Sequence, residues 1–154
     1  MQTKTRLLIT QLAIPLGVGG LSALVTRGGM KRFAALNQPP LSPPGWLFPV
    51  VWTILFAAMG YAAYLICMSG RRQARNAMRP YWLQLAFNFL WSVLFFNLAK
   101  YLAAFLWLIA LWILILITLV RFGRIRKEAG WLLVPYLAWV AFAGYLNFGV
   151  YLLN

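Results

Sequence analysis

The sequence is almost without acidic side chains: Glu128 is the only one in 154 residues, and there is neither Asp nor His. Paired-carboxylate hydrolysis, a Ser-His-Asp triad, histidine metal sites and carboxylate-held magnesium therefore lack the residues they need. The single cysteine, Cys67, excludes a disulfide within the chain. Charged residues make up only 10% of the sequence, against about 25% in an ordinary soluble domain. This is too little charge to cover a water-facing surface, so a soluble globular enzyme is excluded.

Long apolar stretches take the place of charge, and 64% of the residues are hydrophobic. A helix needs about 20 mostly apolar residues to cross the hydrocarbon core of a membrane. Five uncharged stretches meet this requirement, and none shows the alternation of barrel strands. They are residues 7–26, 46–68, 81–99, 101–120 and 131–153. We therefore predict an all-α integral membrane protein, a five-transmembrane-helix bundle in which residues 1–154 form a single membrane domain. Lys100 alone separates the third and fourth spans, which predicts antiparallel neighbours.

The 14 Lys and Arg residues are distributed unevenly between the two sides of this bundle. Ten lie on the side of the N-terminus: Lys4, Arg6, Arg71, Arg72, Arg75, Arg79, Arg121, Arg124, Arg126 and Lys127. Four lie on the other side: Arg27, Lys31, Arg32 and Lys100. The positive-inside rule then predicts a cytoplasmic N-terminus, and we expect a bacterial cell membrane. Short basic clusters between apolar runs are typical of membrane-flanking charge, so we expect no nucleic-acid partner.

The first loop, residues 27–45, is the longest connection and contains four prolines. Proline-dense sequence is stiff and extended. Met30 and Phe33 lie at helical spacing in the loop, and Ser42 followed by Pro43 has the form of a capped helix start. We interpret this loop as a lid over the mouth of the bundle. The alternative is a plain bridge between two tilted helices.

The sequence contains eight tryptophans. Three open predicted spans, as expected for an aromatic belt at the headgroup level: Trp46, Trp82 and Trp131. Trp52, Trp91 and Trp139 lie roughly 9–14 Å deeper at 1.5 Å per residue, where the indole N–H needs a partner from a helix or a ligand. Trp107 and Trp112 have no polar neighbours on the fourth span, which favours packing or lipid contact.

Three predicted helices each present an aromatic face that carries few polar atoms. The residues on these faces are Trp52, Phe56, Met59 and Ala63, then Gln84, Asn88, Trp91, Ser92 and Phe95, then Tyr136, Trp139, Ala143, Leu146 and Asn147. This composition is typical of a pocket for a flat apolar ligand with a few polar groups. The alternative is helix packing, in which Asn, Gln and Ser bond between spans for about 0.6 kcal/mol each. For Asn88 both interpretations remain open. On the first span, Ala13, Gly17 and Gly20 form a smooth face suited to close approach, within the bundle or across a dimer.

Three segments of the sequence carry a family resemblance. Residues 39–53, PPLSPPGWLFPVVWT, resemble the signature at the second span of the tryptophan-rich sensory protein family, also called the translocator protein or peripheral-type benzodiazepine receptor family. Residues 87–92 and 135–147 are similar to its two other landmarks. The resemblance covers nearly the whole chain, and the three segments together make a specific signal.

The resemblance implies a five-helix membrane protein, frequently a homodimer, that binds tetrapyrroles such as protoporphyrin IX and haem, flat hydrophobic drugs and, in eukaryotes, cholesterol. The tetrapyrrole is then ligand or substrate, and no separate cofactor is expected. The implied pocket lies under the first loop, between the first, second, third and fifth spans. Its implied lining residues are Phe48, Trp52, Phe56, Asn88, Trp91, Trp139, Ala143 and Leu146. The sequence departs from the family in the first loop, where Arg32 and Phe33 replace a frequent Trp-Tyr pair. We hypothesise that Arg32 pairs with a propionate of the tetrapyrrole; the alternative is a solvated arginine.

Three functions compete at this point. The first is a membrane-embedded binding or sensory protein, possibly a carrier, for tetrapyrroles. The second is a light-dependent porphyrin-degrading oxidase, in which the resemblance implies Trp52 and Trp139 as the redox-active pair. Such an enzyme needs no acid, base or metal. The third is an exporter of lipophilic cations, which requires a membrane-embedded acid, whereas Glu128 lies in a basic loop.

Overall fold

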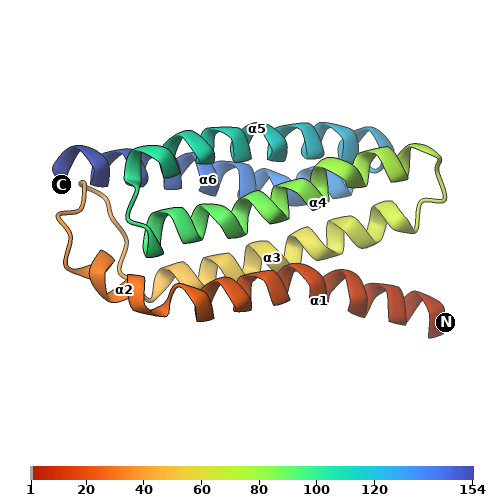
Figure 1. The fold of residues 1–154 in the computed structure, drawn as a ribbon. Coiled ribbons are helices and arrows are strands. Elements are labelled where there is room, and N and C mark those ends of the chain that lie inside the picture. Colours follow the sequence, from red (N-terminus) through yellow and green to blue (C-terminus); the bar gives the residue numbers. More distant parts are fainter. Residues whose placement is uncertain (1) are drawn as a thin grey trace.

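The computed structural model describes residues 2–154 as a bundle of helices (Figure 1). The helices of this part of the chain are α1 (Gln2–Val25), α2 (Arg27–Ala34), α3 (Leu47–Cys67), α4 (Gln73–Ser92), α5 (Tyr101–Ile125) and α6 (Lys127–Leu153). A short π-helical segment, η1 (Val93–Asn97), continues α4. The short helix α2 lies at the end of the bundle that holds the C-terminus, and the N-terminus lies at the opposite end. The arrangement confirms the predicted all-α class.

Four of the described helices are long and apolar enough to cross a membrane: α1 (as Thr3–Val25), α3, α5 and α6. The remaining long helix, α4, begins at Gln73, well before the predicted span at residue 81, and its first turns carry Arg75 and Arg79. Its apolar part begins at Tyr81 and continues through η1. Together with η1, α4 is the fifth long helix of the membrane bundle.

Helix α5 continues farther than the apolar pattern predicted, and only Arg126 separates it from α6. Arg126 is extended, with φ −140° and ψ 120°. The two helices turn back so closely because Gly130 faces Gly123: a Cβ on Gly130 would lie 2.8 Å from the Gly123 Cα. The basic residue Arg124 therefore lies in the last turn of α5, where a cation interacts favourably with the helix carbonyl end.

The wall formed by α1 and α3 depends on a close approach at Gly60. A Cβ on Gly60 would meet the carbonyl oxygen of Gln11 and would lie 2.9 Å from the Leu12 Cα. Farther along α1, Gly19 faces the ring of Phe56. Lipid tails are as apolar as leucine, so helices in a membrane associate through such close packing rather than through water exclusion. The approach seats α1 against α3 and lets α1 contribute to the interior described below.

The predicted small-residue face of α1 is divided by the structure. Gly20 lines the interior cavity described below, whereas Ala13 and Gly17 are exposed and do not line it. A Cβ on Gly17 would have nothing within 4 Å, so packing inside the bundle does not account for Ala13 and Gly17.

The segment after α2, residues 35–46, is held against the C-terminal end of α6. The Asn37 N–H donates to Oδ1 of Asn154 at 3.2 Å, and Nδ2 of Asn154 donates to the Asn37 carbonyl at 2.8 Å. Nearer the bundle, the Tyr145 hydroxyl donates to the Pro40 carbonyl at 2.7 Å. The first loop is thus an ordered cover tied to α6.

The predicted helix start at Ser42 and Pro43 is wrong, because α3 begins at Leu47. The hydroxyl of Ser42 donates to the Pro39 carbonyl at 2.7 Å and so is used inside the loop. The backbone between them turns at Leu41, whose φ is +71°. Because α3 begins at Leu47, its N-cap position is held by Trp46 and not by Ser42.

Candidate functional site

A cavity of ≈ 550 Å³ lies between α1, α3, α4 with η1, and α6, under α2. Its volume falls within the roughly 300–1,000 Å³ of small-molecule sites. The structure brings all eight residues implied by the family resemblance to its wall: Phe48, Trp52, Phe56, Asn88, Trp91, Trp139, Ala143 and Leu146. Sequence segments as far apart as residues 48 and 146 therefore meet at one place.

Aromatic rings form most of the cavity wall and contact one another across three helices. Trp52 of α3 stacks on Phe56, with ring centroids 5.6 Å apart, and lies 6.4 Å from Trp91 of α4. Trp139 of α6 meets Trp52 edge to face at 6.5 Å and Phe48 at 5.9 Å. Such pairs hold each ring in one orientation, so the cavity has rigid, flat walls.

The resemblance implied that the first span borders this cavity, but sequence reasoning assigned none of its residues to the lining. Gly19, Ser22 and Thr26 of α1 line it. Ser22 and Thr26 are polar residues four apart in an apolar span, the same spacing that selected Asn88 and Ser92, so this pair could have been predicted.

The residues that cover the cavity come from α2 and η1. Met30 and Phe33 of α2 line it, together with Phe95 and Phe96 of η1. Phe33 contacts Phe95 and Phe96, with ring centroids 5.6 Å apart in both cases. Arg32, on the same helix, is exposed and does not line the cavity; its Nη1 donates to the Asn97 carbonyl at 3.4 Å. The structure thus places Arg32 on the cover rather than in the wall.

A chain of hydrogen bonds starts at Asn88 and runs away from the cavity. Asn88 Nδ2 donates to the Tyr136 hydroxyl at 2.8 Å, and that hydroxyl donates to Oε1 of Gln84 at 2.6 Å. Nε2 of Gln84 then donates to the sulfur of Met59 at 3.2 Å. All four side chains are buried. Asn88 therefore packs between helices through its nitrogen and also lines the cavity.

The second side-chain amide in the wall, Asn147, forms hydrogen bonds through both its oxygen and its nitrogen. Its Oδ1 accepts from the Trp91 indole N–H at 3.1 Å, and its Nδ2 donates to the Tyr101 carbonyl at 2.8 Å. These two bonds join α4, α6 and the start of α5. They also fix the Trp91 ring, which forms part of the cavity wall.

Four side-chain atoms among residues 2–154 are buried without a hydrogen-bond partner: Gln11 Oε1, Ser22 Oγ, Tyr81 Oη and Trp139 Nε1. Ser22 and Trp139 line the cavity, whereas Gln11 and Tyr81 do not. A buried polar group without a partner costs about 1–3 kcal/mol. A ligand that bonds to Ser22 or Trp139 would recover part of this cost.

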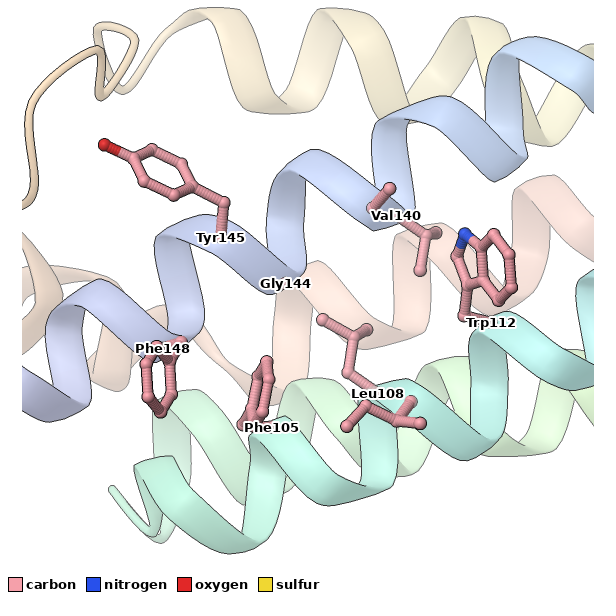
Figure 2. A pocket seen from close by; sticks show the side chains of 9 residues that line it. Phe105, Leu108, Trp112, Val140, Gly144, Tyr145 and Phe148 are labelled. Atoms are coloured by element: carbon pink, nitrogen blue, oxygen red, sulfur yellow. The ribbon is translucent and has the colours of Figure 1, made fainter.

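A second hollow, a groove of ≈ 340 Å³, lies between α5 and α6 (Figure 2). Phe105 and Leu108 of α5 face Gly144 and Phe148 of α6 across it, and Trp112 lies at one end. The Trp112 indole N–H already donates to the Leu137 carbonyl at 3.2 Å. The hydroxyl of Tyr145, the other polar side chain in the lining, is bonded to the loop. With both polar groups used, the groove suits a lipid chain and has little means of selecting a ligand.

Trp107 and Trp112 contact neighbouring helices, and the aromatic belt stays a prediction. Trp107 stacks on Phe87, with ring centroids 4.3 Å apart, and donates to the Phe87 carbonyl at 2.9 Å. Trp107 and Trp112 therefore serve helix packing. Trp46 and Trp131 are 68% and 72% exposed, as expected for rings at a membrane interface. Residues 2–154 contain no group of three His, Cys, Asp or Glu that would hold a metal ion.

The chain is similar to known proteins over nearly its whole length. The model of the TspO/MBR family matches residues 11–153. The chain is 38% identical to tryptophan-rich protein TspO of Chlorobaculum tepidum, over 99% of this chain and 98% of that one. It is 36% identical to tryptophan-rich protein TspO of Archaeoglobus fulgidus, over 96% of each chain. A translocator protein of Bos taurus is 37% identical over 84% of this chain and 79% of its own length.

Replacing Asn147 with leucine should destabilise the bundle by about 1–3 kcal/mol, because it leaves the buried Trp91 indole N–H without a partner and removes the bond to the Tyr101 carbonyl. The matched control is Asn76→Leu on the exposed surface of α4. Thermal unfolding in detergent, followed by far-UV circular dichroism, measures both. Equal midpoints for the two variants would show that the Trp91–Asn147–Tyr101 bonds do not hold these helices together.

Proposed function

The chain belongs to the TspO/MBR family, and from that premise we propose that it binds tetrapyrroles such as protoporphyrin IX or haem, and other flat hydrophobic molecules, in the cavity under α2. The observation that carries this proposal is the cavity itself: rigid aromatic walls on three helices, with unpaired polar atoms of Ser22 and Trp139. A planar apolar ring fits between such walls, and a few peripheral polar groups fit the unpaired atoms. In this proposal the protein binds such a ligand in order to sense or carry it.

We propose that α2 and the following loop act as the lid of this cavity. Met30 and Phe33 cover its mouth, and Asn154 and Tyr145 hold the loop to α6. Arg32 lies on the outer part of this cover, bonded through a long 3.4 Å contact to a backbone carbonyl. A ligand propionate at the mouth would compete for its guanidinium, which suits carboxylate recognition.

The protein is an integral multi-pass membrane protein. We propose a bacterial cell membrane as its location, with the N-terminus in the cytoplasm as the excess of basic residues at that end indicates. Because α2 lies at the end of the bundle opposite the N-terminus (Figure 1), the mouth of the cavity then faces away from the cytoplasm. A reporter at Asn154 active only in the cytoplasm would overturn this orientation.

We further propose a homodimer that associates through the outward face of α1. This face carries Ala13 and Gly17, which the bundle itself does not cover; Gly20, the third small residue of the predicted face, lines the cavity. Small residues let two membrane helices approach closely. Membrane lipid is the other partner that would cover the face. Crosslinking in lipid between cysteines placed at Gly17 distinguishes the two, since only a dimer brings two copies together.

A second candidate, a light-dependent porphyrin-degrading oxidase, is favoured by one observation. The indoles of Trp52 and Trp139 lie 6.5 Å apart between ring centroids, both on the cavity wall. An excited tetrapyrrole in the cavity would lie against this pair and would have two oxidisable rings within contact distance.

Enlarging Ala143 to phenylalanine should weaken protoporphyrin IX binding at least tenfold, because the added ring occupies the cavity that the ligand needs. The matched control, Ala141→Phe, changes the same helix on the side of the α5–α6 groove and should leave binding unchanged. Saturable quenching of tryptophan fluorescence in detergent measures both affinities. Loss of binding in Ala141→Phe instead would place the ligand in the groove.

The double variant Trp52→Phe/Trp139→Phe separates binding from oxidation, because phenylalanine keeps an aromatic wall but is far harder to oxidise than indole. If the protein is an oxidase, wild type bleaches bound protoporphyrin IX under light while the double variant binds it and does not bleach it. Absorbance under illumination, with dark samples as controls, gives the answer. A spectrum equally stable with both proteins rules the oxidase out and leaves the binding protein.

Changing Arg32 to alanine should weaken protoporphyrin IX binding several-fold, whereas the propionate dimethyl ester should bind wild type and variant alike. Lys31→Ala is the control, an exposed cation one residue away on the same helix. The same fluorescence titration applies. Unchanged affinity of Arg32→Ala for protoporphyrin IX would contradict the proposed pairing of Arg32 with a propionate.

A further inference from the structure

Only one member of the hydrogen-bond chain described above reaches the cavity. Asn88 lines it, whereas Tyr136, Gln84 and Met59 do not. Their exposures are 1%, 1% and 0%, so water does not pair with them from outside. The donors and acceptors of these four side chains must therefore pair with one another. Each bond has a donor end and an acceptor end, so the series of bonds runs in one direction.

The direction is set at the far end, by Met59. A thioether sulfur accepts hydrogen bonds and donates none, so the end of the Gln84 amide that faces it is the donor, Nε2, at 3.2 Å. Oε1 of Gln84 is then the acceptor that faces the Tyr136 hydroxyl, and the hydroxyl donates its single hydrogen to it at 2.6 Å. The phenol oxygen can now only accept, and it accepts from Asn88 Nδ2 at 2.8 Å.

The reverse arrangement would place an acceptor against an acceptor. If Asn88 turned its oxygen toward Tyr136, the hydroxyl would have to donate to Asn88 and accept from Gln84. Gln84 would then turn Oε1 toward the Met59 sulfur, with no hydrogen between them. Because these side chains are buried, no water molecule pairs with Gln84 Oε1 or the Met59 sulfur, and the two acceptors would stay unpaired.

The consequence appears at the cavity. With Nδ2 turned toward Tyr136, Oδ1 is the acceptor that the Asn88 amide leaves for a ligand, beside the second Nδ2 hydrogen. No described residue donates to this oxygen, and it is not among the buried polar atoms without a partner, so it is reachable from the cavity. Asn147 offers a contrast in the same wall, because its oxygen is taken by Trp91 and its nitrogen by the Tyr101 carbonyl. Of these two wall amides, Asn88 alone presents a free acceptor.

We propose that Met59, Gln84 and Tyr136 are positioning residues that hold the Asn88 amide with its oxygen toward the cavity, so that the site selects flat ligands carrying an N–H or O–H donor. The proposal rests on the proposed function, since it specifies the chemistry of a ligand in that cavity. It assigns selectivity to residues that touch no ligand.

A pair of flat probes that differ in one donor tests this selectivity. Acridone carries a ring N–H, and N-methylacridone carries a methyl group at the same nitrogen. Wild type should bind acridone about fivefold more tightly, the effect of one ordinary hydrogen bond. In Tyr136→Phe and in Met59→Leu, the hydrogen bonds no longer hold the Asn88 amide in one orientation. Both variants should therefore bring the ratio of the two dissociation constants close to one. The control Tyr64→Phe removes a hydroxyl that takes no part in these hydrogen bonds, and it should keep the wild-type ratio.

The outcomes separate three cases. A wild-type preference that survives in both Tyr136→Phe and Met59→Leu reflects the bulk of the methyl group and overturns the inference, while binding in the cavity stands. The absence of any preference in wild type overturns it as well. If neither probe nor protoporphyrin IX binds, the proposed function fails, and the amide orientation is then tested without ligand. In protein labelled with ¹⁵N-asparagine, the Asn88 Nδ2 hydrogens should show nuclear Overhauser effects to the Tyr136 ring; their absence would overturn the inference.

Discussion

The interior of this bundle is organised by the requirement that a polar group surrounded by helices and lipid find its partner within the protein. Water is absent, and an unpaired group is costly. Gln84, Asn88 and Tyr136 meet the requirement in one chain of bonds, and Trp91 and Asn147 meet it in another. These bonds set the relative positions of α4 and α6. The aromatic rings between these two series of hydrogen bonds are therefore held in place by polar contacts, although the rings provide most of the cavity wall.

Pairing is incomplete at the cavity. Trp139 Nε1 and Ser22 Oγ lack partners there, and the bond direction proposed above leaves the Asn88 oxygen free as well. The α5–α6 groove differs, because its two polar side chains are already bonded within the protein. Free polar atoms give an apolar hollow a means of selecting a ligand, and this difference favours the cavity as the candidate site.

The fold class and most of the site were predictable from local sequence. Apolar length gives the spans, and helical spacing placed Trp52, Asn88, Trp139 and Ala143 on inward faces before any contact was known. What spacing does not contain is the partner on another helix. The pairing of Asn88 with Tyr136, and of Trp91 with Asn147, depends on how α4 and α6 are rotated against each other.

The errors in the sequence prediction have similar causes. Ser42 has the correct residue type for a helix cap but is bonded within its own turn. The connection between α5 and α6 is shorter than the charge pattern suggested because Gly123 and Gly130 permit a close reversal. Charged residues mark where a membrane ends, whereas packing decides where a helix ends.

We propose that the aromatic cavity under α2 is where the protein holds a flat ligand. The most direct test is an experimental structure of the protein with protoporphyrin IX bound. We expect the ring inside the cavity, against Trp52 and Trp139, beneath Phe33 and with Asn88 at its edge. A ring found in the α5–α6 groove or on the outer surface, with the cavity empty, would contradict it.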